Sequence, residues 1–204
     1  GESVGEAFAQ RLAGVFGQQM PVPAAGGGAG GMQLPPGLSL GGAFSLVNQD
    51  GMAVTERDFA GRWMLVYFGF TYCPDVCPTE LGTIAAALDA MGPAGEQVVP
   101  LLISVDPQRD TPAQLKDYVS RFHPRMQGLT GTPEQVAEAA RRYRVYYARA
   151  QRPDQTDYTM DHSSFIYLVG PDGRVRSMFR PETTPEAIAA AVAGQLRSGS
   201  RGSS

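Results

Sequence analysis

The sequence is poor in the residue types that build disulfide scaffolds, membrane spans and nucleic-acid surfaces. It has two cysteines in 204 residues, too few to hold a secreted scaffold of this size together, so the fold must depend on an apolar core. No apolar run approaches the roughly 18 residues of a membrane-spanning helix. The 17 Lys and Arg are scattered among 20 Asp and Glu, which argues against a nucleic-acid partner because phosphate recognition needs a concentrated basic surface.

Glycine and proline divide the chain into a folded unit and two weakly structured ends. Residues 1–20 are compatible with a weak helix or with a disordered tail, and residues 21–38 are so rich in Gly and Pro that they predict a flexible linker. We therefore expect a flexible N-terminal segment over 1–38, one domain over 39–197 and a disordered tail over 198–204. The hydrophobic content, 43%, is ample for the core of such a domain.

Two continuous apolar runs predict the central strands of a sheet, over residues 63–70 and 98–105. The Asp50-Gly51 pair predicts a hairpin before the first of them. After the first run, apolar residues recur at the spacing of an amphipathic helix. These residues are Leu81, Ile84, Ala85, Leu88 and Met91.

Thr-Pro pairs mark three further helix starts, because Thr caps free backbone N–H groups and Pro fits the first helical turn. The pairs stand at 111–112, 132–133 and 184–185. Strands are expected over residues 144–150 and 164–170, and a turn at 171–173 leads to another strand over 174–180. This order of elements predicts a three-layer α/β domain, and its ending on a hairpin and a helix favours a thioredoxin-like arrangement.

The two cysteines, Cys73 and Cys77, are separated by three residues and lie between the first apolar run and its helix. Because Pro78 has no backbone N–H, the helix is expected to start there, with both thiols at or just before its N-terminus. A helical rise of about 6 Å would allow a disulfide or an open dithiol. The helix N-terminus favours the thiolate. The spacing leaves open a weak structural staple, a redox pair and a metal site.

The chain has only two histidines, and they carry different expectations. His123 follows an amphipathic helix in a Pro-containing loop, which favours a surface or capping role. His162 precedes a buried strand and follows a polar loop over about 150–161, which in a thioredoxin-like sheet faces the cysteine-bearing helix. It is either a satisfied polar residue or the third member of a Cys₂His set. Such a set suits Cu(I) and can hold Cu(II), whereas zinc normally takes a fourth ligand.

The sequence from about residue 40 to 197 resembles the Sco/SenC family of copper chaperones. The resemblance rests on separated motifs in the family's order: LVYFGFTYCPDVCPTEL, LLISVDPQRDTPAQLKDYVSRFHP, GLTGT and DHSSFIYLVGPDGRV. It implies a thioredoxin-like fold with an added β-hairpin. It also implies a role in delivering copper, or reducing thiols, during assembly of the CuA centre of cytochrome c oxidase.

The resemblance also implies roles for individual residues. The family's copper ligands fall on Cys73, Cys77 and His162, which are expected to bind Cu(I), Cu(II) or both. The acidic residue of its SVDP block falls on Asp106, which is expected to act behind the ligands without binding the metal.

Three residues next to the expected ligands are not expected to bind the metal. Asp75 and Asp161 flank the ligands and are expected to be turn or capping carboxylates. Tyr72 stands where many family members carry histidine, which removes a nearby nitrogen but leaves the three ligands intact. Most family members also have an N-terminal membrane anchor, which is not visible in this chain and is inferred from the family alone.

The function implied is that of a copper chaperone and not of an enzyme. Its expected partners are the oxidase subunit that carries CuA and another periplasmic copper chaperone or a thiol reductant. Its expected place is the periplasmic face of a bacterial inner membrane or the mitochondrial intermembrane space. A redox or copper sensor would have the same sequence features.

A specialised thiol–disulfide oxidoreductase that uses Cys73 and Cys77 to reduce the oxidase cysteines is the alternative. An ordinary thioredoxin would have two residues between its cysteines and a cis-proline opposite them. This chain has three, and no proline lies between Pro153 and Pro171.

Overall fold

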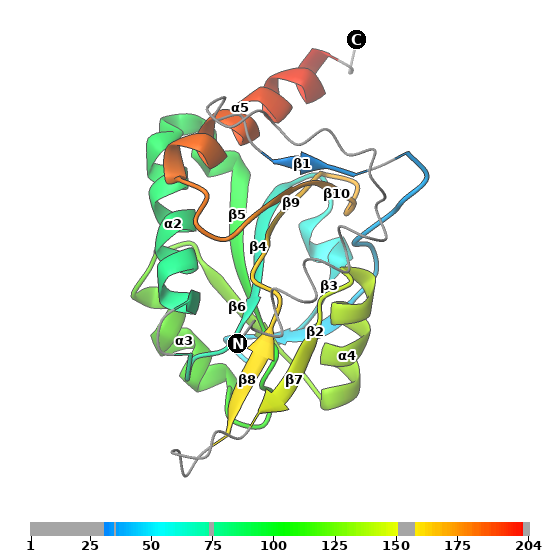
Figure 1. Cartoon of the computed structure of the whole chain (residues 1–204), viewed down its shortest axis with the longest axis vertical. Helices are drawn as coiled ribbons and strands as arrows, with labels where there is room; N and C mark the ends of the chain where they lie inside the picture. The colour runs from blue at the N-terminus through cyan, green and yellow to red at the C-terminus, as the bar shows by residue number, and fades with distance from the viewer. Residues whose placement is uncertain (1–30, 35, 74–75, 151–157, 202–204) are drawn as a thin grey trace.

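A mixed β-sheet forms the core of the described residues (Figure 1). The computed structural model describes residues 31–34, 36–73, 76–150 and 158–201. The strands of this sheet are β1 (Met32–Gln33), β2 (Ser45–Asn48), β3 (Ala53–Thr55), β4 (Trp63–Gly69), β5 (Val98–Ser104), β6 (Gln127–Thr130), β9 (Ile166–Val169) and β10 (Val175–Phe179). Among the described residues they form an eight-stranded sheet in the order β1-β10-β9-β4-β5-β6-β2-β3.

Strands β4 and β5 lie at the centre and run parallel, with Val66 opposite Leu101. Every residue of both strands is buried, as expected for strands covered by helices on both faces. Strand β9 pairs with the other edge of β4 in the antiparallel sense, and β10 pairs with β9. Two parallel strands continued by an antiparallel pair, with helices outside, form a thioredoxin-like core, which confirms the predicted fold class.

Four α-helices surround the sheet in the described part of the chain: α2 (Val76–Ala90), α3 (Pro112–Ser120), α4 (Pro133–Arg142) and α5 (Pro185–Arg201). There are also two short 3-10 helices: η1 (Glu56–Phe59) lies between β3 and β4, and η2 (Gly92–Gln97) lies between α2 and β5. Figure 1 shows the strands between α2 on one side and α4 on the other. None of the described helices combines the length and apolar character needed to cross a membrane.

The helix starts follow the sequence signals closely. At each predicted Thr-Pro start the threonine Oγ1 accepts a hydrogen bond from the backbone N–H three residues later, and the caps are Thr111, Thr132 and Thr184. The cysteine-bearing helix starts at Val76 instead of the expected Pro78. Proline is tolerated as the third residue because the first N–H groups of a helix have no intrahelical partner. Cys77 therefore lies inside the first turn.

The strands β1, β6 and β8 were not predicted, and each has little local signal. Strand β6 contains Gly128 and is recognised only through its pairing with β5 and with β2. Residues 32–33 fall in the expected linker but form β1, because the edge of β10 offers them hydrogen-bonding partners. Residues 198–201, expected to belong to the tail, continue α5. Residues 1–30 and 202–204, also expected to be flexible, lie outside the described residues.

A separate two-stranded sheet carries His162. It pairs β7 (Tyr147–Ala150) with β8 (Thr159–His162) in the antiparallel sense, with Tyr147 opposite His162. The loop expected over about 150–161 therefore contains a strand. Figure 1 shows both strands extending beyond one end of the main sheet. This is the added β-hairpin that the family resemblance implies.

A buried carboxylate joins the loops that follow β4 and β5. Asp110 has no exposed surface, and it accepts hydrogen bonds from the Thr71 backbone N–H (3.0 Å), the Thr71 hydroxyl (2.6 Å) and the Ser104 hydroxyl (2.7 Å). Burial raises the pKa of Asp110, and these hydrogen bonds oppose that shift. Thr71 lies two residues before Cys73, so Asp110 fixes the start of the cysteine segment.

We expect Asp110→Ala to lower the free energy of unfolding by about 2 kcal/mol, because it leaves buried donors on Thr71 and Ser104 without an acceptor. Urea denaturation measures the loss. Asp117→Ala is the matched control, because Asp117 is an exposed carboxylate on α3 whose ion pair with Arg121 is worth little. Equal effects of the two substitutions would contradict the role given to Asp110.

Candidate metal centre

The fold brings the three expected ligands together from three separate segments. Cys73 follows β4, Cys77 lies in the first turn of α2, and His162 is the last residue of β8. Their Sγ and imidazole N atoms all lie within 4.8 Å of one another. Cys77 Sγ is 3.4 Å from His162 Nε2, and the Cys77 backbone N–H donates to Cys73 Sγ over 3.4 Å. A single ion could therefore contact all three side chains.

The orientation of His162 leaves one ring nitrogen for a metal. Its Nδ1 lies 2.9 Å from the backbone carbonyl of Ser163, which can only accept, so Nδ1 carries the hydrogen and donates. Nε2, which faces Cys77, then has a free lone pair. The rings of Tyr67 and Phe70 pack edge-on against the imidazole, with centroid distances of 5.9 and 5.7 Å. Backbone and aromatic contacts thus fix both the tautomer and the direction of the imidazole.

The two thiols differ in exposure and in acidity. Cys73 is half-buried and Cys77 is buried. Hydrogen bonding from Cys77 lowers the pKa of Cys73 to about 4, against an opposing effect of burial. Burial raises the pKa of Cys77, and the negative charge of Cys73 adds to the rise. At neutral pH the pair therefore holds one thiolate, on Cys73, and one thiol, on Cys77.

Gly69 provides the space that Cys77 occupies. A Cβ at this position would lie 2.8 Å from Cys77 Sγ and 2.9 Å from the Tyr67 ring, too close for either contact. Only glycine lets the last residue of β4 pass beneath the thiol. This role of Gly69 was not predicted, although a glycine that interrupts a buried apolar strand often marks a place where another group packs closely against the backbone.

Asp106 is not part of the cluster and is bound to two residues that were also not predicted. Its Oδ2 accepts from Arg109 Nε at 2.5 Å, and its Oδ1 accepts from the Tyr158 hydroxyl at 2.9 Å. The Tyr72 side chain, 57% exposed, has the Arg109 guanidinium 4.5 Å from its ring centroid. Asp106 can therefore influence the ligands only through neighbouring side chains.

The other acidic and imidazole candidates do not join the cluster within the described structure. His123 Nδ1 accepts from the Arg125 backbone N–H at 3.1 Å, which matches the predicted capping role, and burial lowers its pKa. Asp75 and the side chain of Asp161 lie outside the described residues.

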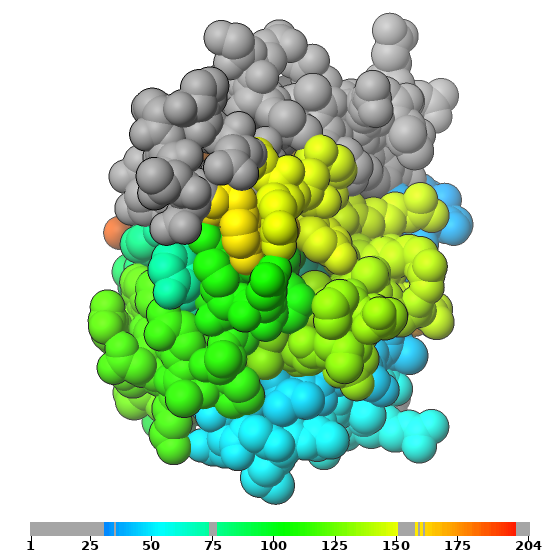
Figure 2. Space-filling model, turned by 90° about the horizontal axis from the view of Figure 1, so that it is seen from below, coloured from blue at the N-terminus to red at the C-terminus, as the bar shows by residue number. Residues whose placement is uncertain are grey.

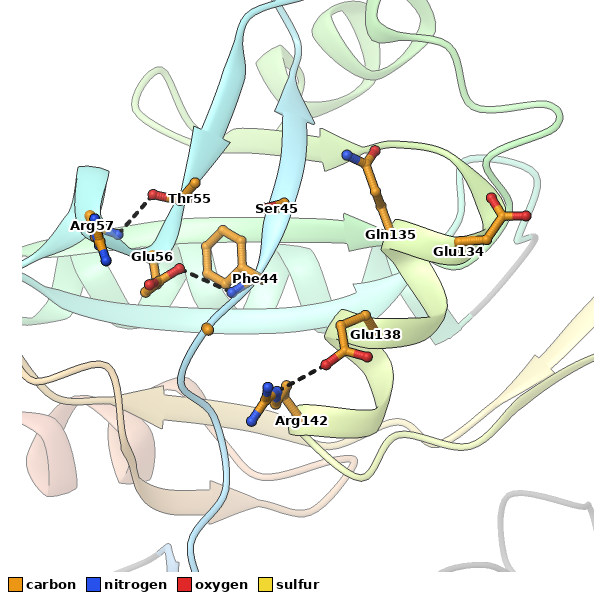
Figure 3. A pocket seen from close by; sticks show the side chains of 10 residues that line it. Phe44, Ser45, Thr55, Glu56, Arg57, Glu134, Gln135, Glu138 and Arg142 are labelled. Carbon is orange, nitrogen blue, oxygen red and sulfur yellow. Dashed lines mark hydrogen bonds and ion pairs between the residues drawn. The ribbon is translucent and has the colours of Figure 1, made fainter.

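A hollow of the described surface lies away from this cluster and offers no soft ligand. It has a volume of about 540 Å³ and lies between β2, η1 and α4 (Figure 3). Some of its charged groups already have partners, since Glu138 bonds Arg142 and Glu56 accepts from the Phe44 backbone N–H. No cysteine or histidine lines it. The thiol–imidazole cluster is therefore the candidate site.

The donor set limits the ions that the cluster can hold. Two sulfur atoms and one neutral imidazole nitrogen are soft to intermediate donors, which favour copper over magnesium, calcium or manganese. Among the described residues no fourth cysteine, histidine or carboxylate joins the group, whereas structural zinc sites normally have four protein ligands. The residues present thus fit a three-coordinate Cu(I) ion, or Cu(II) with an added ligand.

Comparison with known sequences identifies the family of the chain. The family model SCO1/SenC matches residues 33–197. The chain is 50% identical over 135 residues to protein SCO1 homolog 1, mitochondrial, of Arabidopsis thaliana. The matched region covers 66% of this chain and 40% of the relative. It is 43% identical over 160 residues to the human protein SCO1 homolog, mitochondrial, with 78% and 53% covered. The chain thus spans about half the length of these relatives.

Solved structures show the same fold. Arabidopsis thaliana ScoI with copper bound superimposes with a TM-score of 0.74 at 44% identity, covering 78% of this chain and 99% of that one. Bradyrhizobium japonicum ScoI with copper bound superimposes with a TM-score of 0.70 at 46% identity, and the match covers 76% of this chain and 98% of that one. BsSco, described with a disulfide switch and as a member of the Sco family of cytochrome c oxidase assembly proteins, gives 0.60 at 28% identity, covering 79% and 96%.

The lowered pKa of Cys73 predicts an unusual pH profile for alkylation. Because the thiolate is the reactive form, the rate with iodoacetamide should stay constant from pH 8 to about pH 5 and fall only near pH 4. Mass spectrometry identifies the modified cysteine. Cys77→Ala, which removes the side-chain hydrogen bond to Cys73 and keeps the backbone one, should shift the profile to higher pH. A folded protein whose rate rises steadily up to about pH 8.5, as for an ordinary thiol, would contradict the assignment.

Proposed function

Because the chain belongs to the SCO1/SenC family, we propose that it is a copper chaperone that binds one copper ion through Cys73, Cys77 and His162. The observation that carries the proposal is the cluster of two sulfur atoms and one imidazole nitrogen within 4.8 Å, drawn from three segments. The relatives solved with copper bound supply independent support, because they share both the fold and the sequence at 44–46% identity.

The geometry gives each ligand a distinct part in carrying copper. His162 presents a neutral imidazole nitrogen, and Cys73 is already a thiolate at neutral pH. Cys77 must lose its proton when the ion binds. Since Cys73 is the more exposed of the two sulfurs, we propose that copper enters and leaves through it, by exchange with ligands of the donor or acceptor.

The proposed acceptor is the subunit of cytochrome c oxidase that carries the CuA centre. Support comes from BsSco, whose family is described as cytochrome c oxidase assembly proteins. Another copper chaperone as donor, or a thiol reductant, completes the proposed set of partners. The proposed place of action is the periplasmic face of a bacterial membrane or the mitochondrial intermembrane space, since the curated relatives are named as mitochondrial.

A second candidate function, thiol–disulfide exchange, has its own supporting observation. Cys73 is an accessible thiolate, and Cys77 lies beside it as a potential resolving thiol. Cys73 would attack a disulfide of the oxidase subunit and form a mixed disulfide. Cys77, after losing its proton, would then attack Cys73 Sγ and release the substrate dithiol. Two electrons pass to the substrate, the Cys73–Cys77 disulfide forms, and a thiol reductant must restore the dithiol.

Substitution of the ligands tests the copper proposal. We expect the reduced protein to bind one Cu(I) in anaerobic competition titrations, and Cys73→Ser and Cys77→Ser to abolish tight binding because each leaves one soft sulfur. His162→Ala should weaken binding by about tenfold or more, equivalent to at least ~1.4 kcal/mol. His123→Ala removes an imidazole bound elsewhere and should have no effect.

The same variants separate the two candidate functions. Thiol exchange needs both sulfur atoms but no imidazole–metal bond, so His162→Ala should still form and reduce the Cys73–Cys77 disulfide. A His162→Ala protein that retains wild-type copper affinity would exclude the three-ligand site. If disulfide turnover and copper affinity are both lost, His162 serves the thiols themselves, and the oxidoreductase function is favoured.

The number of protons released when copper binds should depend on whether each of the two thiols is protonated beforehand. Cys73 is deprotonated well below pH 7, whereas the pKa of Cys77 is raised well above its ordinary value. Between pH 7 and 8, Cu(I) binding should therefore release about one proton, and log K should rise by about one per pH unit. Calorimetry in buffers of different ionisation enthalpy measures the number. Release of two protons would mean that Cys73 is not a thiolate, and release of none that Cys77 does not bind.

A further inference from the structure

Arg109 connects the segment after β5 to the hairpin that carries His162. Its Nε donates to Asp106 Oδ2 at 2.5 Å, and its Nη1 donates to the Tyr158 backbone carbonyl at 2.8 Å. The Arg109 side chain is 17% exposed, and that of Asp106 is 3% exposed. A charge-assisted hydrogen bond in such a sheltered position is stronger than one at the surface.

Aromatic rings hold the same guanidinium. Its Cζ lies 3.9 Å from the ring centroid of Tyr158 and 4.5 Å from that of Tyr72. Both distances are within the range of cation–π contacts. Tyr72 immediately precedes Cys73, so Arg109 touches the cysteine segment as well as the hairpin. Tyr158 also donates its hydroxyl to Asp106 Oδ1 at 2.9 Å, which closes a ring of contacts among Asp106, Arg109 and Tyr158.

The hairpin is attached to the domain by side chains: Tyr147 and Met160 pack against the core, and Arg109 adds a polar attachment. Strand β8 begins directly after Tyr158 and ends at His162, and among the described residues it pairs only with β7. An isolated two-stranded hairpin is at best marginally stable in water. Figure 2 shows the yellow and yellow-green atoms of the hairpin beside the green atoms of the region after β5. The contacts of Arg109 join these two regions at the start of β8, while the hydrogen bond of His162 Nδ1 acts at its end.

We propose that Arg109 is a positioning residue for the metal centre, clamping Tyr158 to Asp106 and Tyr72 so that β8 holds His162 against the two thiols. The proposal rests on the proposed function in one respect, that His162 binds copper. Arg109 itself touches neither the ion nor the ligands' donor atoms. Its effect on copper binding passes through the position of the hairpin.

The clamp requires the shape of arginine as well as its charge. Arg109 makes two hydrogen bonds in different directions while its plane contacts two rings. A lysine ammonium is a point charge without a planar face, so it cannot reproduce this combination. Arg109→Lys should therefore behave much like Arg109→Ala. A role that depended on positive charge alone would instead be preserved in Arg109→Lys.

Hydrogen exchange in the copper-free protein tests the clamp without reference to the metal. Arg109→Ala and Arg109→Lys should each speed exchange of the β7 and β8 amides on the order of tenfold, because the hydrogen bonds and cation–π contacts that hold the hairpin are lost. The amides of β4 and β5 should be unchanged. Arg121→Ala, which removes an exposed arginine at the end of α3, is the charge-matched control and should leave the hairpin unchanged. Equal exchange in wild type and in both Arg109 variants would overturn the proposal.

A double-mutant cycle then tests whether Arg109 acts through His162. Arg109→Ala should weaken Cu(I) binding about fivefold in the wild-type background but less than about twofold when His162 is already alanine. The same loss in both backgrounds would overturn the proposal, because Arg109 would then act through the thiols or through charge. If His162→Ala alone leaves affinity unchanged, the proposed ligand set fails, and the exchange result still decides whether Arg109 holds the hairpin.

A second substitution keeps the test usable if Arg109→Ala does not fold. Tyr158→Leu removes the ring and the hydroxyl from the hairpin while Arg109 retains its bond to Asp106. It should speed exchange of the β7 and β8 amides and weaken Cu(I) binding in the same direction as the Arg109 variants. A Tyr158→Leu protein with wild-type exchange and wild-type affinity would overturn the proposal.

Discussion

The parallel pairing of β4 with β5 is the constraint on which the rest of the site depends. Because both strands end at the same edge of the sheet, the segments that follow them meet there. One segment carries the cysteines, and the other carries Asp106, Arg109 and Asp110. Asp110 joins the two at Thr71, and Arg109 extends the connection to the hairpin. The candidate ligands thus come from two distant places in the sequence, the cysteine segment and the hairpin, and are brought together at this end of β4 and β5.

An element can be predicted from the sequence when the residues that determine it are neighbours in the chain. The central strands and the capped helices were predicted because a few neighbouring residues determine each of them. The cluster of Cys73, Cys77 and His162 could be expected from the sequence because cysteine and histidine are so scarce that few combinations exist. Gly69, Arg109 and Tyr158 were missed since their roles arise from contacts with distant segments, Tyr158 being 49 residues from Arg109. Strand β8 was missed because its short, polar sequence lacks an alternating pattern.

The cysteine and histidine side chains of the cluster are held in place in different ways. Cys77 lies in a helix turn packed over Gly69 and Tyr67, where even one added carbon would not fit. His162 lies on a small separate sheet that packs against the core through side chains, including Tyr147 and Met160. In the proposed metal centre, Cys77 would therefore be held by the core itself, whereas the position of the imidazole would depend on the side-chain contacts of the hairpin.

The hydrogen bond from His162 Nδ1 to a backbone carbonyl has a consequence for the oxidation state of the site. It keeps the imidazole neutral when Nε2 binds, so the two thiolates supply all of the ligand charge. With Cu(I) the centre then has a net charge of −2 + 1 = −1, whereas with Cu(II) the net charge is −2 + 2 = 0, as it also is in the disulfide form. Cys77 and His162 are both buried, and a buried net charge is costly. These surroundings would therefore lower the reduction potential of a bound copper ion, favouring Cu(II). The lowered pKa of Cys73 acts in the opposite sense on the cysteine pair, because a stabilised thiolate favours the reduced dithiol.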